Sequence, residues 1–362
     1  MKVHKVIGIM SGTSGDGVDL AYCHFTEQDG KWKYSIENIR TIPFDHIWDL
    51  RLKELHHQNP IAFVKTDIFF GHYLGKLVND FIREEKIEAE LVSSHGHTVF
   101  HQPEKGITCQ IGHGASIHAE CGLPVVSDFR SLDVALGGQG APLVSIADRM
   151  LFSEYDFCLN LGGIANLSAE VSQKRIAYDI CPCNLILNYL AIPLGKSYDE
   201  GGNFARKGNI NEELLVILNS LPYYKKHFPK SLGREWVDAC IKPLLRMSKI
   251  PTEGKLATFC GHIAHQIHQS ISELIQISDT TKKFRLLITG GGAYNQFLIE
   301  TIRKYLSPLP VTLEIPDKNL IEFKEAMIFG FLGVLRIRNE VNCLSSVTGA
   351  GRDNAGGVVW GG

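Results

Sequence analysis

Near its start the chain reads Val6-Ile7-Gly8-Ile9-Met10-Ser11-Gly12-Thr13-Ser14-Gly15-Asp16-Gly17-Val18-Asp19. Apolar residues on both sides predict two short strands, and the Gly/Ser/Thr/Asp middle predicts a tight turn. Glycines let successive backbone N–H groups converge on one anion, while the Asp16 and Asp19 carboxylates suit Mg²⁺. A phosphate with its metal ion would use all of these groups. The alternative is an ordinary glycine-rich hairpin with solvated side chains.

The composition is that of a globular protein. The 362 residues exceed what one core usually supports, which predicts two domains. A formal net charge of −2 gives no reason to expect nucleic acid or an anionic membrane as a partner. No stretch reads as a signal peptide or a membrane span. The nine cysteines lack a regular framework, so we expect reduced thiols in a cytoplasm.

Strand and helix patterns alternate along the chain in two halves. Each half has a glycine-rich turn between strands, at residues 12–17 and 162–163. The glycine-rich segment 136–142 is the best linker candidate, which predicts lobes at 1–135 and 136–362 and leaves open whether the C-terminal helix packs back on the first lobe. This pattern predicts an α/β protein with ligand chemistry in a cleft between the lobes.

Two later glycine-bearing turns are candidates for nucleotide contacts. Residues 159–166 form an ordinary hairpin if taken alone, but paired with the first turn they would supply a second wall of a phosphate slot. Residues 289–295 lie between a strand and a helix, where a base and ribose could approach bare backbone. Neither is a Walker A loop or a Rossmann GxGxxG in its required setting.

Two charged residues end apolar strands. Asp179 sits in surroundings that should raise the pKa of its carboxyl, which suits a general base; the alternative is an N-cap for the helix near residue 185. Arg130 could fork onto a carboxylate or phosphate, or pair internally with Asp128 or Asp133.

Histidines offer a rival interpretation as a zinc site. They gather at 95, 97, 101, 113 and 118, and again at 262, 265 and 268. None of these sets has a CxxC or HExxH spacing, and His262 and His268 diverge by roughly 120° around a helix.

Taken together, the motifs resemble those of the anhydro-N-acetylmuramic acid kinase family, within the superfamily of sugar kinases, actin and heat-shock chaperone ATPases. The resemblance covers nearly the full length. The matching segments are residues 8–19, 94–101, 128–130, 137–143, 160–166, 229–235, 290–295, 324–326 and 348–350.

The resemblance implies a two-lobed actin-like fold, each lobe a mixed sheet with flanking helices of ribonuclease-H-like type. It implies transfer of the γ-phosphate of ATP to O6 of 1,6-anhydro-N-acetylmuramic acid while water opens the anhydro bridge at C1. The products are N-acetylmuramate 6-phosphate and ADP, in cytoplasmic recycling of peptidoglycan. ATP and Mg²⁺ are the implied cofactors, and a homodimer is left open.

The resemblance also assigns residues. Asp179 matches the catalytic aspartate that takes a proton from the attacking water, and Asp16 or Asp19 would lie near Mg²⁺, partly through water. The implied nucleotide-binding residues are Gly12, Thr13, Ser14, Gly15, Asp16, Gly17, Val18, Asp19, Asn160, Gly162, Gly163, Gly290, Gly291, Gly292 and Asn295. The implied substrate-binding residues are Ser11, His97, Thr98, Arg130, Gln139, Asn166 and Glu325, with Arg130 meeting the lactyl carboxylate.

The chain departs from the family pattern beside the catalytic aspartate. The usual Asp-Thr-Gly-Pro-Gly-Asn is here Asp179-Ile180-Cys181-Pro182-Cys183-Asn184, so a hydroxyl and two glycines are lost. Asn188 replaces a usual aspartate, His97 a usual glutamine, and Gly15 a larger residue. These differences bear on loop geometry and substrate choice. Two rival functions therefore stay open: a related ATP-dependent enzyme for another sugar, and a non-catalytic module in which ATP sets the angle between lobes.

Overall fold

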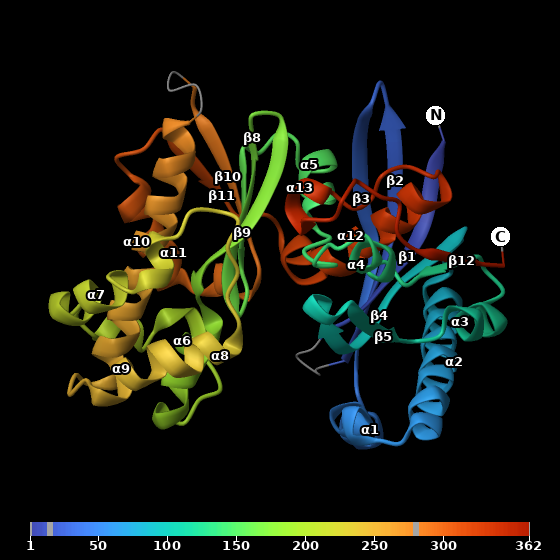
Figure 1. The fold of residues 1–362 in the computed structure, drawn as a ribbon, viewed down its shortest axis with the longest axis horizontal. Coiled ribbons are helices and arrows are strands. Elements are labelled where there is room, and N and C mark those ends of the chain that lie inside the picture. The colour runs from blue at the N-terminus through green and yellow to red at the C-terminus, as the bar shows by residue number, and fades with distance from the viewer. Residues whose placement is uncertain (1, 13–16, 278–281, 362) are drawn as a thin grey trace. The chain divides into compact units, whose positions relative to one another are not determined.

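The computed structural model describes residues 2–12, 17–277 and 282–361 and divides the chain into two compact units (Figure 1). One unit contains Met1–Phe152 and Glu322–Gly362, and the other contains Ser153–Ile321. The division differs from the predicted lobes 1–135 and 136–362 because segment 136–142 is not a linker. Its Gly140 N–H donates to the buried Asp133, and its Gln139 N–H donates to the Thr348 carbonyl, both at 2.8 Å.

The first unit is built on a seven-stranded mixed sheet ordered β12-β6-β4-β1-β2-β3, with β5 paired to β4. The strands are β1 (Val3–Ser11), β2 (Gly17–Gln28), β3 (Lys31–Pro43), β4 (Leu91–Gln102), β5 (Ile107–Ile111), β6 (Val125–Ser127) and β12 (Val358–Trp360). β1, β2 and β3 are antiparallel, whereas β4 runs parallel to β1 and β6 parallel to β4. The two strands predicted around the first glycine-rich turn are confirmed as β1 and β2.

Helices cover both faces of this sheet, because successive side chains of β1 point to opposite faces and most of them are buried. The helices are α1 (His46–Glu54), α2 (Pro60–Glu85), α3 (Gly114–Cys121), α4 (Ser131–Ala135), α5 (Ser145–Met150), α12 (Lys318–Ile337), which begins in the second unit, and α13 (Ser345–Thr348). α2 begins at the N-cap Asn59 and shares a buried core with Ile7 and Ile9 of β1. Gly8 points to the opposite face, against α12.

Gly8 gives a first testable prediction. A Cβ at this position would lie 1.9 Å from the Ala326 carbonyl oxygen, a backbone atom that can move only if the whole helix moves. We expect Gly8→Ala to lower the unfolding free energy of the first unit by about 1–3 kcal/mol, measured by urea denaturation. Gly351→Ala is the matched control because its nearest neighbour, the Leu136 carbonyl oxygen, would be 3.6 Å away. Equal stability of the two variants would contradict the packing argument.

The second unit repeats the topology of the first. Its five strands are β7 (Phe157–Leu161), β8 (Ile164–Val171), β9 (Lys174–Pro182), β10 (Phe284–Thr289) and β11 (Val311–Glu314). The order β11-β10-β7-β8-β9 again places three antiparallel strands beside two parallel ones. It corresponds strand for strand to β6-β4-β1-β2-β3 of the first unit. The α/β class with two mixed sheets of ribonuclease-H-like order is therefore confirmed.

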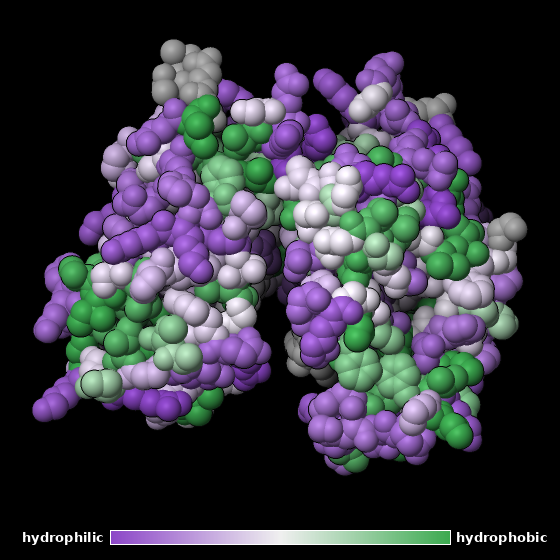
Figure 2. All heavy atoms as spheres, in the orientation of Figure 1, coloured by the Kyte–Doolittle hydropathy of each residue, from purple (hydrophilic) through white to green (hydrophobic). Residues whose placement is uncertain are grey.

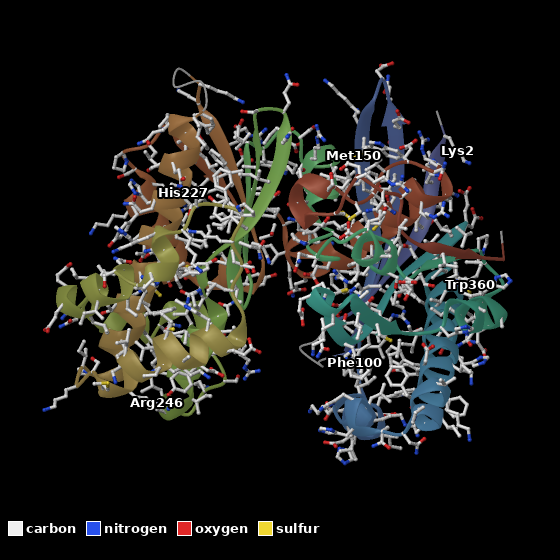
Figure 3. The ribbon with its side chains drawn as sticks, in the orientation of Figure 1. Lys2, Phe100, Met150, His227, Arg246 and Trp360 are labelled. Carbon is white, nitrogen blue, oxygen red and sulfur yellow. The ribbon has the colours of Figure 1, made fainter. Side chains whose placement is uncertain are left out.

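The core of the second unit lies between this sheet and its helices. These are α6 (Asn184–Ala191), α7 (Glu212–Asn219), α8 (Arg234–Trp236), α9 (Lys242–Met247), α10 (Thr252–Gln276) and α11 (Gln296–Leu306). α10 contributes fully buried residues at helical spacing, among them Leu256, Ile263 and Ile267. Polar residues cover most of the surface visible in Figure 2, with hydrophobic patches between them. Within the described ranges, no helix has both the length and the apolar character needed to cross a membrane.

Candidate active site

In the first unit, two predicted substrate residues lie side by side. Ser11 at the end of β1 is in register with His97 of β4, and Ser11 Oγ lies 3.0 Å from His97 Nδ1. Both side chains are buried, and burial lowers the pKa of His97, so the ring is neutral near pH 7. Next along β4, Thr98 is half-buried and its hydroxyl accepts a bond from Gln110 (3.4 Å). The pair formed by Ser11 and His97 provides a hydroxyl and a ring nitrogen suited to a sugar, while Thr98 follows on the alternate face of the strand.

Arg130 is held by groups that the sequence analysis did not assign to it. Its Nε and Nη2 donate to Nε2 of His95 (3.1 and 2.9 Å), and its Nη1 donates to the Gly140 carbonyl (2.5 Å). The alternative of an internal pair with Asp128 or Asp133 is wrong, because Asp128 accepts from Ser131 and Asp133 accepts from neutral donors. Burial lowers the pKa of Arg130 to about 10, so it stays a cation.

Asp133 organises the loop that carries Gln139. This carboxylate is fully buried in α4. Its Oδ2 accepts from the Gly140 N–H, and its Oδ1 accepts from Cys343 Sγ (3.0 Å), Thr348 Oγ1 (2.8 Å) and Asn354 Nδ2 (3.0 Å). The contacts tie segment 136–142 to the C-terminal segment. Gln139 is thereby presented on the surface by a rigid loop.

Glu325 places a negative charge near Arg130 and is itself influenced by Asp19. Glu325 of α12 reaches solvent, yet the protein packed around it raises the pKa of its carboxyl; Arg130 and Lys324 oppose this shift and Asp19 adds to it. Lys324 itself forms a buried ion pair with Asp148 (3.0 Å). The predicted substrate residues Arg130 and Glu325 are therefore close enough to influence each other's charge.

In the second unit, three predicted residues form one row across the sheet. Asn160 of β7 is in register with Asn166 of β8, and Asn166 is in register with Asp179 of β9. Directly paired residues project from the same face of a sheet. The register shifts at Ala165/Asn166, so Ile180 is an extra residue between the pairs Asn166–Asp179 and Ala165–Cys181. The row brings two amides and one carboxylate together on a half-buried face.

Asp179 has the properties expected of a general base. Its Oδ2 accepts from the Leu232 N–H (2.8 Å), which fixes the carboxylate, while its carbonyl accepts from the Tyr223 hydroxyl (2.7 Å). Burial raises the pKa of Asp179, and the Leu232 N–H opposes this only in part. The alternative role as a helix cap is wrong, since α6 has Cys183 at its N-cap position. A backbone hydrogen bond holds the segment that carries Leu232 beside Asp179: the Lys230 carbonyl accepts from the Asp179 N–H (3.1 Å).

The two glycine turns of the second unit meet at β7. The Gly162 and Gly163 carbonyls accept N–H groups from Cys183, Asn184 and Leu185 at the start of α6. Gly290 follows β10 with a φ of +82°, and a Cβ there would lie 2.4 Å from Asn160 Oδ1. Gly292 packs as closely on Leu161, where a Cβ would lie 2.7 Å from the Leu161 Cβ. Glycine is therefore required at positions 290 and 292, where the chain after β10 approaches β7 too closely for a side chain.

A pocket of about 640 Å³ opens beside the third glycine run. Its lining includes Asn184, Asn188, Asp199, Glu200, Tyr198, Gly291, Tyr294 and Asn295. Asn295 is buried, and its Oδ1 already accepts from the Leu298 N–H (3.0 Å) as the N-cap of α11. The size and the mixture of amide, aromatic and backbone groups suit a nucleoside.

Four predicted nucleotide residues, Thr13, Ser14, Gly15 and Asp16, lie outside the described residues. Their neighbours are described: Gly12 follows β1, while Gly17, Val18 and Asp19 begin β2, with Asp19 opposite Met10. The residues that sequence reasoning did not assign to the site are His95, Asp133 and Leu232. His95 belongs to a motif quoted for the resemblance, but its partner could not be inferred without the fold.

Of the two carboxylates predicted to lie near magnesium, Asp19 is among the described residues and Asp16 is not. Mg²⁺ bound with ATP needs one or two carboxylates, because phosphates and water complete its coordination. The Asp19 carboxylate is partly exposed and accepts a bond from Thr41 Oγ1 (2.6 Å). The rival zinc interpretation finds no support in the described part of the chain, where no three His, Cys, Asp or Glu side chains gather as metal ligands.

Known proteins are similar to this chain over nearly its whole length. A family model described as anhydro-N-acetylmuramic acid kinase matches residues 4–361. Proteins of that name from Sulfurimonas denitrificans and Sulfurovum sp. are 32% and 34% identical, with 98% and 99% of both chains covered. A solved structure, the activator of the 2-hydroxyisocaproyl-CoA dehydratase from Clostridium difficile with bound ADPNP, has a TM-score of 0.41 at 11% identity, covering 91% of this chain and 94% of that one. The chain belongs to the anhydro-N-acetylmuramic acid kinase family.

Proposed function

We propose that this chain is an ATP-dependent kinase that phosphorylates O6 of 1,6-anhydro-N-acetylmuramic acid while water opens the anhydro ring. The products are N-acetylmuramate 6-phosphate and ADP, and the reaction serves peptidoglycan recycling in the cytoplasm. Family membership supports the reaction class. The observation that carries the proposal is Asp179: an oriented carboxylate with a raised pKa, at the end of the row formed with Asn160 and Asn166.

In the proposed reaction Asp179 accepts a proton from water as the water oxygen forms a bond to C1. The C1–O6 bond breaks, and its electron pair lets O6 form a bond to the γ-phosphorus. The bond from the γ-phosphorus to the bridging oxygen breaks and ADP leaves. The proton on Asp179 then passes to solvent, which balances the reaction. Because the water must be deprotonated near neutral pH, a carboxylate with a raised pKa is better matched to it than an ordinary one.

The sugar contacts in this proposal come from the substrate residues of the first unit. The Arg130 guanidinium pairs with the lactyl carboxylate, and Glu325 accepts hydroxyl donors of the sugar. Ser11, His97, Thr98 and Gln139 supply further hydrogen bonds, and Asn166 assists from the row with Asp179. Asn160 and the glycine turns contact ATP. Mg²⁺ would be held by Asp19, with Asp16, and would neutralise charge on the transferred phosphoryl group.

The proposal is tested by product analysis in ¹⁸O water with ATP and the anhydro sugar. We expect a sugar 6-phosphate with label at C1 and no label in the phosphate ester. Authentic N-acetylmuramate 6-phosphate incubated for the same time corrects for exchange at C1. Phosphorylation of a different sugar would replace the proposed substrate, whereas ATP binding without any sugar phosphate would favour the non-catalytic module. Light scattering on the same sample tests whether the chain forms a homodimer, which the resemblance leaves open.

The assignment of adenosine to the 640 Å³ pocket makes its own prediction. Gly291 is exposed there, and a Cβ on it meets nothing closer than Asn184 Nδ2 at 3.7 Å. A larger side chain therefore projects into the pocket without disturbing the fold. We expect Gly291→Leu to raise the KM for ATP by about tenfold or more with an unchanged melting temperature. An unchanged KM for ATP would place the adenosine elsewhere.

A further inference from the structure

His95 is a buried histidine whose two ring nitrogens have different partners. Nδ1 lies 2.9 Å from the Gly96 carbonyl oxygen, which can only accept, so Nδ1 carries the proton. Nε2 therefore has a free lone pair, and it accepts from both Nε and Nη2 of Arg130. The tautomer is set by the backbone: Gly96 has a φ of +72°, and a Cβ there would lie 2.4 Å from the Ile111 carbonyl oxygen.

The ring of His95 has little freedom to turn. It is 5% exposed, and its centroid lies 4.5 Å from that of Phe329. Burial and the Arg130 charge lower the pKa of His95 to about 3. A protonated ring would put an N–H donor against the guanidinium, so the neutral form is the one that can hold Arg130.

The contacts of Arg130 leave a defined pair of donors. A guanidinium has five N–H groups. His95 takes the Nε–H and one N–H of Nη2, and the Gly140 carbonyl takes one N–H of Nη1. One N–H remains on each terminal nitrogen. The outer N–H groups of the two terminal nitrogens are parallel and match the two oxygens of a carboxylate, and both stay available where Gly140 accepts the other Nη1–H, on the Cδ side.

We propose that His95 is a positioning residue that, as the neutral Nδ1–H tautomer, orients Arg130 for bidentate binding of the substrate's carboxylate and so sets the preference for an acid over a neutral sugar. This inference rests on the proposed function, since it concerns how that substrate is selected. His95 does not touch the reacting atoms. It acts through Arg130, which without this acceptor could rotate and offer the carboxylate a single N–H.

The test compares 1,6-anhydro-N-acetylmuramic acid with its lactyl amide as substrates. For the native protein we expect kcat/KM to favour the acid by about 10- to 100-fold. His95→Phe keeps an aromatic ring against Phe329 but removes the acceptor. We expect this variant to lose most of the preference through a higher KM for the acid, with little change in kcat or in the KM for ATP. His95→Gln restores an acceptor near the Nε2 position and should recover part of the preference.

A double-variant comparison separates positioning from packing. In an Arg130→Met background, His95→Phe should change the acid-to-amide ratio no further, because its effect passes through Arg130. Retention of the full preference in His95→Phe, or equal losses in His95→Phe and His95→Gln, would overturn the inference. If His95→Phe does not fold, the ¹⁵N shifts of the His95 ring in the native protein decide the tautomer. The acid-to-amide preference of His95→Gln then decides whether the acceptor at this position matters. Should the native protein turn over neither sugar, the proposed function fails, and equilibrium binding of the acid and the amide to the same variants still decides the role of His95.

Discussion

Replacing Asp179 by Asn should lower kcat by about 10²- to 10⁴-fold, the range that a positioned general base contributes. The amide keeps the shape of the side chain, and its oxygen can still accept the Leu232 N–H that holds Oδ2 at 2.8 Å. What it cannot do is take a proton from water. The KM values for ATP and for the sugar should change little, because the residues proposed to bind ATP and the sugar do not include this carboxylate. Steady-state kinetics with coupled detection of ADP and direct detection of the sugar phosphate give the measurement.

The pKa of Asp179 adds a pH dependence to this prediction. Burial raises that pKa above the ordinary value of 3.8, and activity requires the ionised form. Activity should therefore fall as the pH drops through the raised pKa, so the acidic limb lies above pH 3.8. Stability runs the other way: an ionised group with a raised pKa disfavours folding at neutral pH, and the cost disappears as it becomes protonated. Asp179→Asn should thus be at least as stable as the native protein at pH 7.

Asp238→Asn is the matched control for Asp179→Asn. Asp238 lies in the same unit, is exposed, and pairs with Lys242 four residues away. Its replacement should leave kcat and the pH profile unchanged. Near-normal turnover by Asp179→Asn, or an unshifted acidic limb in the native protein, would remove the general-base assignment.

The succession of strands and glycine turns in two halves was accessible from the sequence, but the row formed by Asn160, Asn166 and Asp179 was not. Apolar strands, glycine turns and the repetition of one pattern in both halves predict two similar sheets. The alignment of the row follows from the two-residue turn at Ser172 and Gln173, because the pairs from Val171–Lys174 to Asn166–Asp179 keep one register, and the extra residue Ile180 shifts only the pairs beyond them. A one-residue slip at this turn would have turned Asp179 to the other face. Side-chain patterns do not fix the register of such a hairpin when both faces of a strand are largely buried.

The predicted boundary at 135/136 was wrong for a different physical reason. A run containing Gly137, Gly138 and Gly140 has the composition of a linker, yet composition does not reveal long-range hydrogen bonds. Gly138 is close-packed, because a Cβ there would lie 2.2 Å from Asp133 Oδ2. The glycines allow the loop to approach a buried carboxylate whose other partners come from residues more than 200 positions later. The same contact set decides the presentation of Gln139 and, through Gly140, of Arg130.

Asp133→Ala should destabilise the first unit by about 3–5 kcal/mol, because several buried donors lose their acceptor and each unsatisfied donor costs about 1–3 kcal/mol. The change leaves four donors without their acceptor: the Gly140 N–H, the Cys343 thiol, the Thr348 hydroxyl and the Asn354 amide. Burial raises the pKa of Cys343, so its thiol stays a donor. Urea denaturation measures the loss, and hydrogen exchange should show faster exchange confined to residues 136–142 and 342–354. The KM for the sugar should rise with it, since the Gly140 carbonyl that accepts from Arg130 is then no longer fixed.

Two further variants decide whether the loss in Asp133→Ala comes from the lost hydrogen bonds or from the removal of a negative charge. Asp353→Ala removes an exposed carboxylate that accepts from the Ser345 N–H (2.7 Å) and hydroxyl (2.6 Å), and it should cost only a small fraction of the loss in Asp133→Ala. The stability of Asp133→Asn should lie between those of Asp133→Ala and Asp353→Ala. The amide oxygen can accept from the Gly140 N–H or from the three donors on the other side, but not from both, and the NH₂ group then faces donors that it cannot bond. Equal stability of Asp133→Ala and Asp353→Ala, or unchanged exchange in residues 136–142, would mean that the loop is held by something other than this carboxylate. Arg130 would then owe its orientation to His95 alone, and the KM for the sugar should be insensitive to residue 133.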